Sequence, residues 1–485
     1  MRAITLAAVL FLLTLSAGCG SSGGAVAVSG SAALTGEGRG AVNAISCAAP
    51  GDCAAGGNYN GGSYYPAFVL SDANGSWGNV IKVQGAAGGA PHGYAGDLGV
   101  SSISCAAAGD CAAGGWYTDG SSKKAFVVDD TSGSWGHAID VPGLAITPPG
   151  QAKVNSISCA APRECAAGGY RTDHRGVDFN NAFMVNQTNG TWRPAIAVSG
   201  LAALEGGGQY AVSEVDSISC ARAGDCAAAG YYSRDASVFS GDRAFLVNEK
   251  NGSWGNAINV PGLSRRPAGL NSISCAAAGE CAAGGDYTDR SSGQAFVVNQ
   301  TNGTWGHAIE VPGLATLNTG ADAAVNSISC AAAGECAAGG VYSVHGSRTP
   351  RAFVVSETNG RWGNAIEVPG AATLYGGGYA EVDSISCAKA GDCTAAGFSY
   401  RRGQSDYRPF VVSETNGRWG NAITLPGTVT SMDGTYGSIS ISCSAADACT
   451  AGGSIADNSG RRRAFVVSET NGSWGKAIRV GNFPA

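Results

Sequence analysis

Short apolar stretches alternate with polar, turn-forming segments along the chain, and the same order of stretches recurs eight times. The sixth copy shows the pattern clearly, with apolar stretches at residues 326–330, 336–342, 352–355 and 362–368. None of these stretches is long enough for a typical helix, and each is bounded by Gly, Asn, Pro or Ser. The pattern therefore predicts four β-strands per repeat and no helix.

Two connections inside each repeat have residues that are typical of tight turns. An Asn-Gly pair precedes a Trp in every copy except the second, which has Ser132-Gly133 instead. Asn and Gly both tolerate positive φ, so this pair predicts a tight type I′ hairpin between the third and fourth strands. The other connection lies between two cysteines, at the junction of the first and second strands.

The chain has 17 cysteines, and all but Cys19 fall into pairs that are separated by five residues. This spacing suits a disulfide across the mouth of a hairpin in an exported protein. A metal site is the alternative, but no C-x2-C spacing and no neighbouring His recur, so we expect neither metal nor cofactor. The predicted pairs are Cys47/Cys53, Cys105/Cys111, Cys159/Cys165, Cys220/Cys226, Cys275/Cys281, Cys330/Cys336, Cys387/Cys393 and Cys443/Cys449.

Eight four-stranded repeats can close into a ring or stack in a line, and a ring leaves only short sheet edges. Every copy has a Phe in its third strand and a Trp after the hairpin, and such rings can fill the wedge between neighbouring blades. We therefore predict an all-β fold, an eight-bladed β-propeller of four-stranded antiparallel blades with one disulfide per blade, over residues 25–485. The Phe positions are Phe68, Phe126, Phe183, Phe245, Phe296, Phe353, Phe410 and Phe465.

These features resemble the β-propellers of the Asp-box and sialidase-like superfamily, and more closely the actinobacterial secreted propellers with a repeated Ser-Cys-x5-Cys-x-Ala-x-Gly element. An Asp-box runs Ser-x-Asp-x-Gly-x-x-Trp, whereas residues 356–362 read Ser-Glu-Thr-Asn-Gly-Arg-Trp. This segment is shorter and has Asn where the box has Asp. The resemblance implies the fold, and it assigns no activity because propellers host many functions.

The N-terminus has the pattern of an export signal. Met1-Arg2 precedes an apolar run of residues 3–15, and Ser16-Ala17-Gly18 then precedes Cys19. This arrangement resembles the lipobox of bacterial lipoproteins, which implies a signal peptide over residues 1–18 and a lipid on Cys19. An ordinary cleaved signal is the alternative. Residues 19–24 then form a Gly/Ser tether.

Residues 25–30 form a ninth copy of the fourth-strand pattern, similar to residues 195–200. Two arrangements remain open. Residues 25–30 can complete the last blade and displace residues 477–480, or they can lie outside the ring as an extra edge strand.

Comparison of the repeats separates two faces of the expected propeller. The connections between strands one and two and between strands three and four hardly vary, whereas the other connections vary in length and chemistry. Function is therefore expected on the varied face. Tyr, Trp and Arg suit protein interfaces and sugar faces, although single surface residues are the alternative. The ligand-binding candidates are Tyr65, Trp116, Tyr117, Arg175, Tyr232, Tyr400, Arg401 and Arg402.

A second candidate site is the mouth of the central channel. The position two before the Ile of each first strand is polar in seven repeats, and Asp216 and Asp383 are its only charged residues. These two carboxylates could hold a cation or a polar ligand, or they could cap turns. A repeated acid before the second Cys, by contrast, suggests turn chemistry. These acids are Asp52, Asp110, Glu164, Asp225, Glu280, Glu335 and Asp392.

The charge balance argues against nucleic-acid binding, because 36 acidic residues outnumber 30 basic ones. The five His residues lack metal-ligand spacing, and no catalytic motif follows a strand-to-helix pattern. We therefore expect a non-catalytic, monomeric binding or scaffold propeller at the cell envelope, lipid-anchored or otherwise secreted. Its partner is expected to be an envelope protein or a glycan, with membrane contact only through the lipid. The alternative is a propeller-type, glycan-active hydrolase or lyase.

Overall fold

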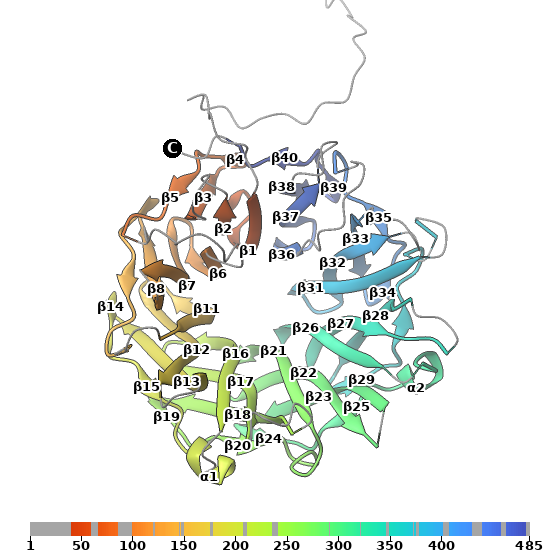
Figure 1. The fold of residues 1–485 in the computed structure, drawn as a ribbon. Helices are drawn as coiled ribbons and strands as arrows, with labels where there is room; N and C mark the ends of the chain where they lie inside the picture. The colour runs from red at the N-terminus through yellow and green to blue at the C-terminus, as the bar shows by residue number, and fades with distance from the viewer. Residues whose placement is uncertain are drawn as a thin grey trace, which may run out of the picture.

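The structure is a computed structural model, and its residues form eight antiparallel sheets around a central opening (Figure 1). This arrangement confirms the eight-bladed β-propeller. We number the blades 1 to 8 in chain order. The structure describes residues 40–59, 66–85, 99–119, 122–144, 146, 150–174, 178–206, 211–234, 241–290, 292–320, 322–345, 349–371, 373–374, 378–400, 407–428, 439–456 and 462–481.

The first strand of each blade lies innermost, next to the opening (Figure 1). The innermost strands are β1 (Gly40–Ala49), β6 (Gly99–Ala107), β11 (Ala152–Ala161), β16 (Val212–Arg222), β21 (Ala268–Ala277), β26 (Ala323–Ala332), β31 (Tyr379–Lys389) and β36 (Ile439–Ala445). The second strands are β2 (Asp52–Tyr59), β7 (Asp110–Asp119), β12 (Glu164–His174), β17 (Asp225–Ser233), β22 (Glu280–Asp289), β27 (Glu335–Tyr342), β32 (Asp392–Tyr400) and β37 (Ala448–Ala456).

The outer, fourth strand is divided into two short pieces, and both pair with the third strand. The third strands are β3 (Ala67–Ala73), β8 (Ser122–Thr131), β13 (Asp178–Thr188), β18 (Arg243–Lys250), β23 (Ser292–Thr301), β28 (Arg351–Thr358), β33 (Tyr407–Thr415) and β38 (Arg462–Thr470). The outer pieces are β4 (Ser76–Trp77), β5 (Ile81–Lys82), β9 (Ser134–Trp135), β10 (Ile139–Asp140), β14 (Thr191–Trp192), β15 (Ile196–Ala197), β19 (Ser253–Trp254), β20 (Ile258–Asn259), β24 (Thr304–Trp305), β25 (Ile309–Glu310), β29 (Arg361–Trp362), β30 (Ile366–Glu367), β34 (Arg418–Trp419), β35 (Ile423–Thr424), β39 (Ser473–Trp474) and β40 (Ile478–Arg479).

The prediction of no helix is wrong at two exit loops. Single helical turns form at α1 (Leu201–Glu205) and α2 (Leu314–Leu317). Each follows a glycine with positive φ, and its first leucine is buried against the neighbouring blades. Docking of this leucine, rather than helix propensity, accounts for the turns. None of the helices in the described ranges is long and apolar enough to cross a membrane.

The core consists of apolar layers between neighbouring blades. One such layer joins Val297 of blade 5 to Val325 and Phe353 of blade 6. The eight third-strand Phe residues are all buried, which confirms them as core. Packing is close enough to require glycine at some positions, because a Cβ on Gly284 would lie 2.5 Å from Cγ1 of Val325.

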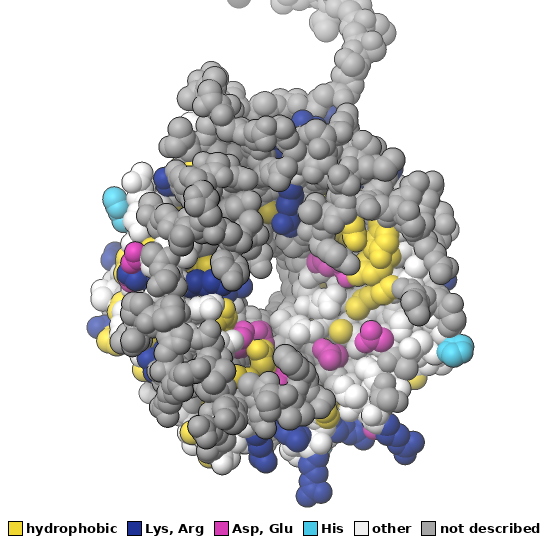
Figure 2. All heavy atoms as spheres, in the orientation of Figure 1, with side chains coloured by type: hydrophobic (Ala, Val, Ile, Leu, Met, Phe, Trp, Pro, Cys, Tyr) yellow, Lys and Arg dark blue, Asp and Glu magenta, His cyan; other side chains and the backbone are white. Residues whose placement is uncertain are grey.

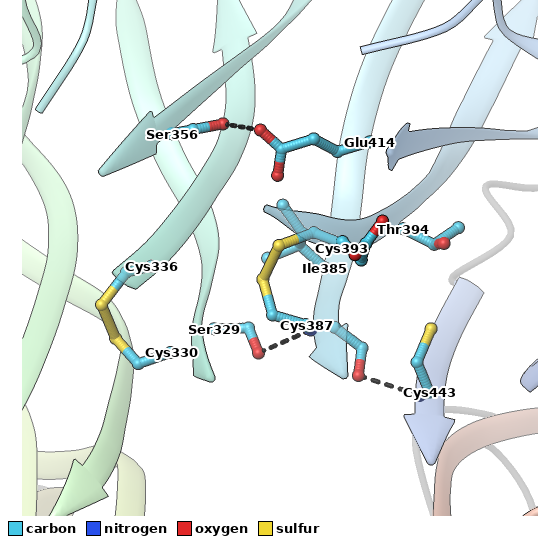
Figure 3. Close-up of a disulfide and its surroundings, with 12 residues drawn as sticks. Ser329, Cys330, Cys336, Ser356, Ile385, Cys387, Cys393, Thr394, Glu414 and Cys443 are labelled. Atoms are coloured by element: carbon cyan, nitrogen blue, oxygen red, sulfur yellow. Dashed lines mark hydrogen bonds between the residues drawn. A yellow bond between two sulfur atoms is a disulfide. The ribbon is translucent and has the colours of Figure 1, made fainter. Parts of the chain in front are cut away.

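The eight predicted disulfides are all present. In each pair the two cysteines lie directly opposite each other on the first and second strands, as Cys387 and Cys393 do (Figure 3). They therefore brace the hairpins predicted from the spacing. A chain with this many disulfides is suited to an oxidising compartment.

The two cysteines of each disulfide are buried to different extents. The second cysteine begins the buried run of the second strand and belongs to the apolar layer between blades, while the first is only partly buried against that layer. The disulfides are therefore core contacts as well as braces. The buried cysteines are Cys53, Cys111, Cys165, Cys226, Cys281, Cys336, Cys393 and Cys449.

Alternation along the second strand explains this burial. In blade 1, Cys53 and Ala55 share the face of β2 that packs against Ala464 and Val466 of blade 8. The Cys-x5-Cys spacing fixes the pairing within a blade, but it does not show which side chain faces the neighbouring blade.

Serine side chains connect each innermost strand to the next one. The backbone N–H of Ile385 donates to Oγ of Ser327 at 3.1 Å. The N–H of Cys387 donates to Oγ of Ser329 at 3.0 Å (Figure 3). The repeated Ser-Ile-Ser-Cys segment thus forms an inter-blade contact, in which the serines of one blade accept from N–H groups of the next. Apolar packing and these hydrogen bonds together align the blades.

The same serine contacts close the ring. Ile45 and Cys47 of blade 1 donate their N–H groups to Ser440 and Ser442 of blade 8, at 3.2 and 2.9 Å. The outer piece β40 pairs with β38, so residues 477–480 keep the place of the fourth strand and are not displaced. Residues 25–30, the ninth copy of that pattern, lie outside the described residues.

The uniform face is stabilised by contacts between its two sets of turns. Asn359 and Gly360 both have positive φ, as the predicted hairpin requires, and Gly360 N–H donates to the Gly334 carbonyl at 3.0 Å. The repeated acids act in these turns. Carboxylates accept from the backbone N–H of the turn Asn at Glu164, Glu280, Glu335 and Asp392. Turn chemistry is therefore confirmed at these four positions.

Candidate functional site at the channel mouth

The channel mouth on the varied face is built by the first residues of the innermost strands. On β31, Tyr379, Glu381 and Asp383 are partly exposed, whereas the alternating Ala380 and Val382 are buried between blades. Alternation along a strand puts the first three side chains on one face. Figure 2 shows acidic side chains around the central opening on the side of the molecule that is in view.

Asparagines in this ring bind one blade to the next. Asn43, Asn155, Asn271 and Asn326 each donate Nδ2 to a valine carbonyl of the following blade, at 2.9 to 3.0 Å. Each asparagine lies where the pairing of the first and second strands shifts register. Half of the eight ring positions are therefore structural, as the alternative interpretation of these positions expects.

Asp216 and Asp383 replace asparagine in blades 4 and 7, and an ionised carboxylate has no proton to donate to a carbonyl. Burial, together with the charge of Glu214, raises the pKa of Asp216 to about 8. Burial, together with the charge of Glu381, raises the pKa of Asp383 well above its usual value, against a backbone hydrogen bond from Ile439. Asp216 therefore favours the protonated form near neutral pH, and burial disfavours the charged form of Asp383 as well.

The acids of blade 4 have many neighbouring partners. Glu214 accepts hydrogen bonds from Asn180 of blade 3 and from Tyr231 of its own blade. The nearby ammonium group of Lys153 favours the charged forms of both Glu214 and Asp216. We call these five residues the blade-4 cluster, and its own donors and cation already balance much of its negative charge.

The acids of blade 7 lie beside tyrosines. Tyr379 donates its hydroxyl proton to Glu381, and its ring stacks on Tyr400 with the centroids 4.4 Å apart. Tyr400 also contacts Tyr407, at 4.7 Å between centroids. Oδ2 of Asp383 is buried and has no hydrogen-bond partner among the described residues. We call these five residues the blade-7 cluster.

Three of the predicted ligand-binding residues are packed within blades. Trp116 is buried, with the Lys123 ammonium 4.4 Å above its ring. The Tyr117 hydroxyl donates to Asp140 at 2.6 Å, and the fully buried Tyr232 donates to Asn259 at 2.7 Å. They lie at the ends of second strands rather than in loops, because those strands continue beyond the Gly-rich segment. Their roles in binding stay predictions.

The other predicted residues divide into two groups. Tyr400 and Asp383 come together in the blade-7 cluster, and Asp216 belongs to the blade-4 cluster. Their role in ligand binding also stays a prediction. Outside the described residues lie Cys19, Tyr65, Arg175, Arg401 and Arg402.

Sequence reasoning missed Glu214 and Glu381. A signal for them was present, because Glu-Val-Asp occurs only in the fourth and seventh repeats, as residues 214–216 and 381–383. The position of the Glu is filled by Ala, Gly or Lys in the other repeats. A comparison of every position across the repeats, rather than only the Asp position, would have found the pair.

Further cavities lie at equivalent positions between neighbouring blades. Cavities of about 270 and 290 Å³ lie on the uniform face at the junctions of blades 3 with 4 and 4 with 5. Both are lined by the disulfide hairpins and the Asn-Gly turns, so they come with the repeated architecture. Among the described residues, no group of three His, Cys, Asp or Glu side chains is placed to hold a metal ion.

No protein-family model matches the chain, and no curated protein matches it either. Solved propeller structures do resemble it at the level of the fold. An ulvan lyase, a polysaccharide lyase, is 9% identical over 91% of this chain and 96% of its own, with a TM-score of 0.44. A prolyl endopeptidase is 12% identical over 89% of this chain and 54% of its own, with a TM-score of 0.42.

A Hadza microbial sialidase is 11% identical over 74% of this chain and 73% of its own, with a TM-score of 0.35. The chain spans about half the length of the prolyl endopeptidase. These neighbours include hydrolases, a lyase and sialidase-like proteins.

Proposed function

We propose that the protein is a non-catalytic, extracytoplasmic binding module that holds its partner over the channel mouth of the varied face. One observation carries the proposal. Blades 4 and 7 place four carboxyl groups at mouth positions that the other blades fill mainly with Ala, Gly, Asn or Ser. Burying a carboxyl group costs free energy, so this departure from an otherwise uniform repeat suggests selection for a ligand.

The disulfides support the extracytoplasmic location in this proposal. Eight disulfides favour an oxidising location outside the cytoplasm. A lipid on Cys19 would keep the module at the envelope. The test is fractionation of cells that express the full chain or its Cys19→Ser variant. We expect the first in the membrane fraction and the second in the soluble extracytoplasmic fraction, and equal distribution would argue against the anchor.

The binding proposal is tested by capture of partners from an envelope extract and by a glycan array. The wild-type chain is compared with a Glu381→Gln/Asp383→Asn variant, and with a variant in which Glu280 and Asp110 of the uniform face become Gln and Asn. We expect partners that only the channel-mouth variant loses. Identical partners for all three proteins would contradict the assignment of the site.

The second candidate is a glycan-active hydrolase or lyase, and one observation favours it. A tyrosine is hydrogen-bonded to Glu381, and the adjacent Asp383 has a raised pKa. A carboxylic acid that stays protonated near neutral pH can act as a general acid in glycoside cleavage. Release of reducing ends or unsaturated products from polysaccharides by the wild type, but not by Asp383→Asn, would establish this function in place of simple binding.

A further inference from the structure

The two carboxyl groups of the blade-7 cluster have no cationic partner among the described residues. None of the ion pairs between described residues includes Glu381 or Asp383. Glu381 has one side-chain donor, Tyr379, whereas Glu214 of the blade-4 cluster has several donors and a neighbouring ammonium group. Within the described part of the chain, Glu381 and Asp383 therefore lack the neighbouring cation that Glu214 and Asp216 have.

Aromatic rings lie next to these carboxyl groups. Tyr379, Tyr400 and Tyr407 come from three adjacent strands of blade 7, and Tyr400 stacks on Tyr379 while its ring is tilted against that of Tyr407. Figure 2 shows a hydrophobic patch in the region of β31, β32 and β33, with acidic side chains between it and the opening. Because the face of an aromatic ring attracts cations, the rings and the carboxylates favour the same kind of ligand.

The depth of the cluster limits the shape of that ligand. Tyr379, Glu381 and Asp383 follow one another along one face of β31, so at about 3.3 Å per residue the cluster extends roughly 13 Å along the strand. A lysine or arginine has a slender apolar stem that can pass the rings and a charged end that can reach the carboxyl groups. An amino group carried directly on a bulky pyranose ring has no such reach.

We propose that the blade-7 cluster binds a lysine or arginine side chain of a partner polypeptide, inserted into the channel mouth beside the three tyrosines. This inference rests on the proposed binding function and gives its ligand a chemical class. The inserted cation favours the ionised forms of Glu381 and Asp383, which burial otherwise disfavours, and the tyrosine rings contact its stem. Buried charges that gain a partner in this way contribute mainly to slow dissociation and to specificity.

The test uses the full chain and fluorescein-labelled hexalysine and hexaarginine peptides, with binding followed by fluorescence anisotropy. We expect Glu381→Gln and Asp383→Asn each to weaken binding at least about tenfold. Tyr400→Leu should weaken it about threefold through loss of the ring face. The matched control Glu280→Gln removes the same charge from the uniform face and should change the affinity less than about twofold. Unchanged melting temperatures confirm that each variant is folded.

Four results would overturn the inference. Channel-mouth variants that bind the peptides as the wild type does would remove Glu381 and Asp383 from the site. An equal loss in Glu280→Gln would show attraction to net charge alone. A chitosan oligomer that binds where the peptides do not would replace the polypeptide with an amino-sugar glycan. If envelope capture finds a partner that depends on Glu381 but neither peptide binds, the cation inference fails while the proposed function stands.

Discussion

Single residues decide the character of the channel mouth. Asn326 donates to the Val382 carbonyl, so an amide at this position adds a bond between blades. Asp216 occupies the same position in blade 4 and is nearly buried, next to Glu214. The acid therefore weakens the fold at a site where asparagine would strengthen it, and this cost is what a binding role would explain.

Replacement of this acid should stabilise the protein in a pH-dependent way. Because the folded pKa of Asp216 is about 8 and its unfolded value is near 3.8, the folded state holds a proton that the unfolded state loses between these values. The free energy of unfolding of the wild type therefore falls as the pH rises through this window. We expect Asp216→Asn to gain roughly 1–3 kcal/mol at about pH 8 and much less at about pH 4.

Denaturant unfolding of both proteins at the two pH values measures the effect, with Glu280→Gln as the control of equal charge change. A gain that is the same at both pH values, or largest at the acidic one, would show that Asp216 is not held in its protonated form.

At the scale of strands and turns, features whose contacts lie within one repeat could be predicted from the local sequence pattern. The Asn-Gly turns and the paired cysteines could be predicted, because each depends on neighbours in the same blade, and the Phe positions could be predicted because they recur in every repeat. The serine contacts could not, since Ser329 binds a residue that is 58 positions away. The Tyr379, Glu381 and Tyr400 grouping likewise depends on strand register that the apolar pattern leaves undefined. The two single helical turns could not be predicted from helix propensity, because they form where a leucine docks against the neighbouring blades.

The close contact between Gly284 of blade 5 and Val325 of blade 6 predicts that a larger side chain at Gly284 clashes, and that a smaller one at Val325 relieves the clash. Gly284→Ala would place its Cβ against Val325 of the next blade, and overpacking of this kind costs about 1–3 kcal/mol. In a Val325→Ala background the same change should cost far less, because the opposing methyl groups are gone. A double-mutant cycle by thermal unfolding measures the coupling, and purely additive losses would mean that the two residues do not press on each other.

At the scale of the whole molecule, the ring closes with the same contacts that join its interior blades. Ser442 at the closing junction and Ser329 at an interior one both accept from a cysteine N–H, at 2.9 and 3.0 Å. No described strand from the N-terminal end of the chain enters blade 8. The closing junction is therefore held by packing and hydrogen bonds alone within the described part of the chain.

Because the closing junction and the interior junction have the same serine contact, we expect the same loss of stability when either serine is replaced. We expect Ser442→Ala and Ser329→Ala each to lower the free energy of unfolding by about 1–2 kcal/mol, since each leaves an inter-blade N–H without its acceptor. The solvent-exposed Ser473→Ala serves as the control and should change stability by less than about 0.5 kcal/mol. A loss at the interior junction with none at the closing one would indicate that something other than Ser442 seals the ring.

The claim on which the rest depends is that partners contact the varied face. Cross-linking mass spectrometry of the chain with a partner captured from the envelope tests it most directly. We predict cross-links to Lys153, a member of the blade-4 cluster, and none to Lys389, which ends β31 opposite Asp392 on the uniform face. Cross-links that gather at Lys389 and the Asn-Gly turns would place the partner on the opposite face and contradict the account.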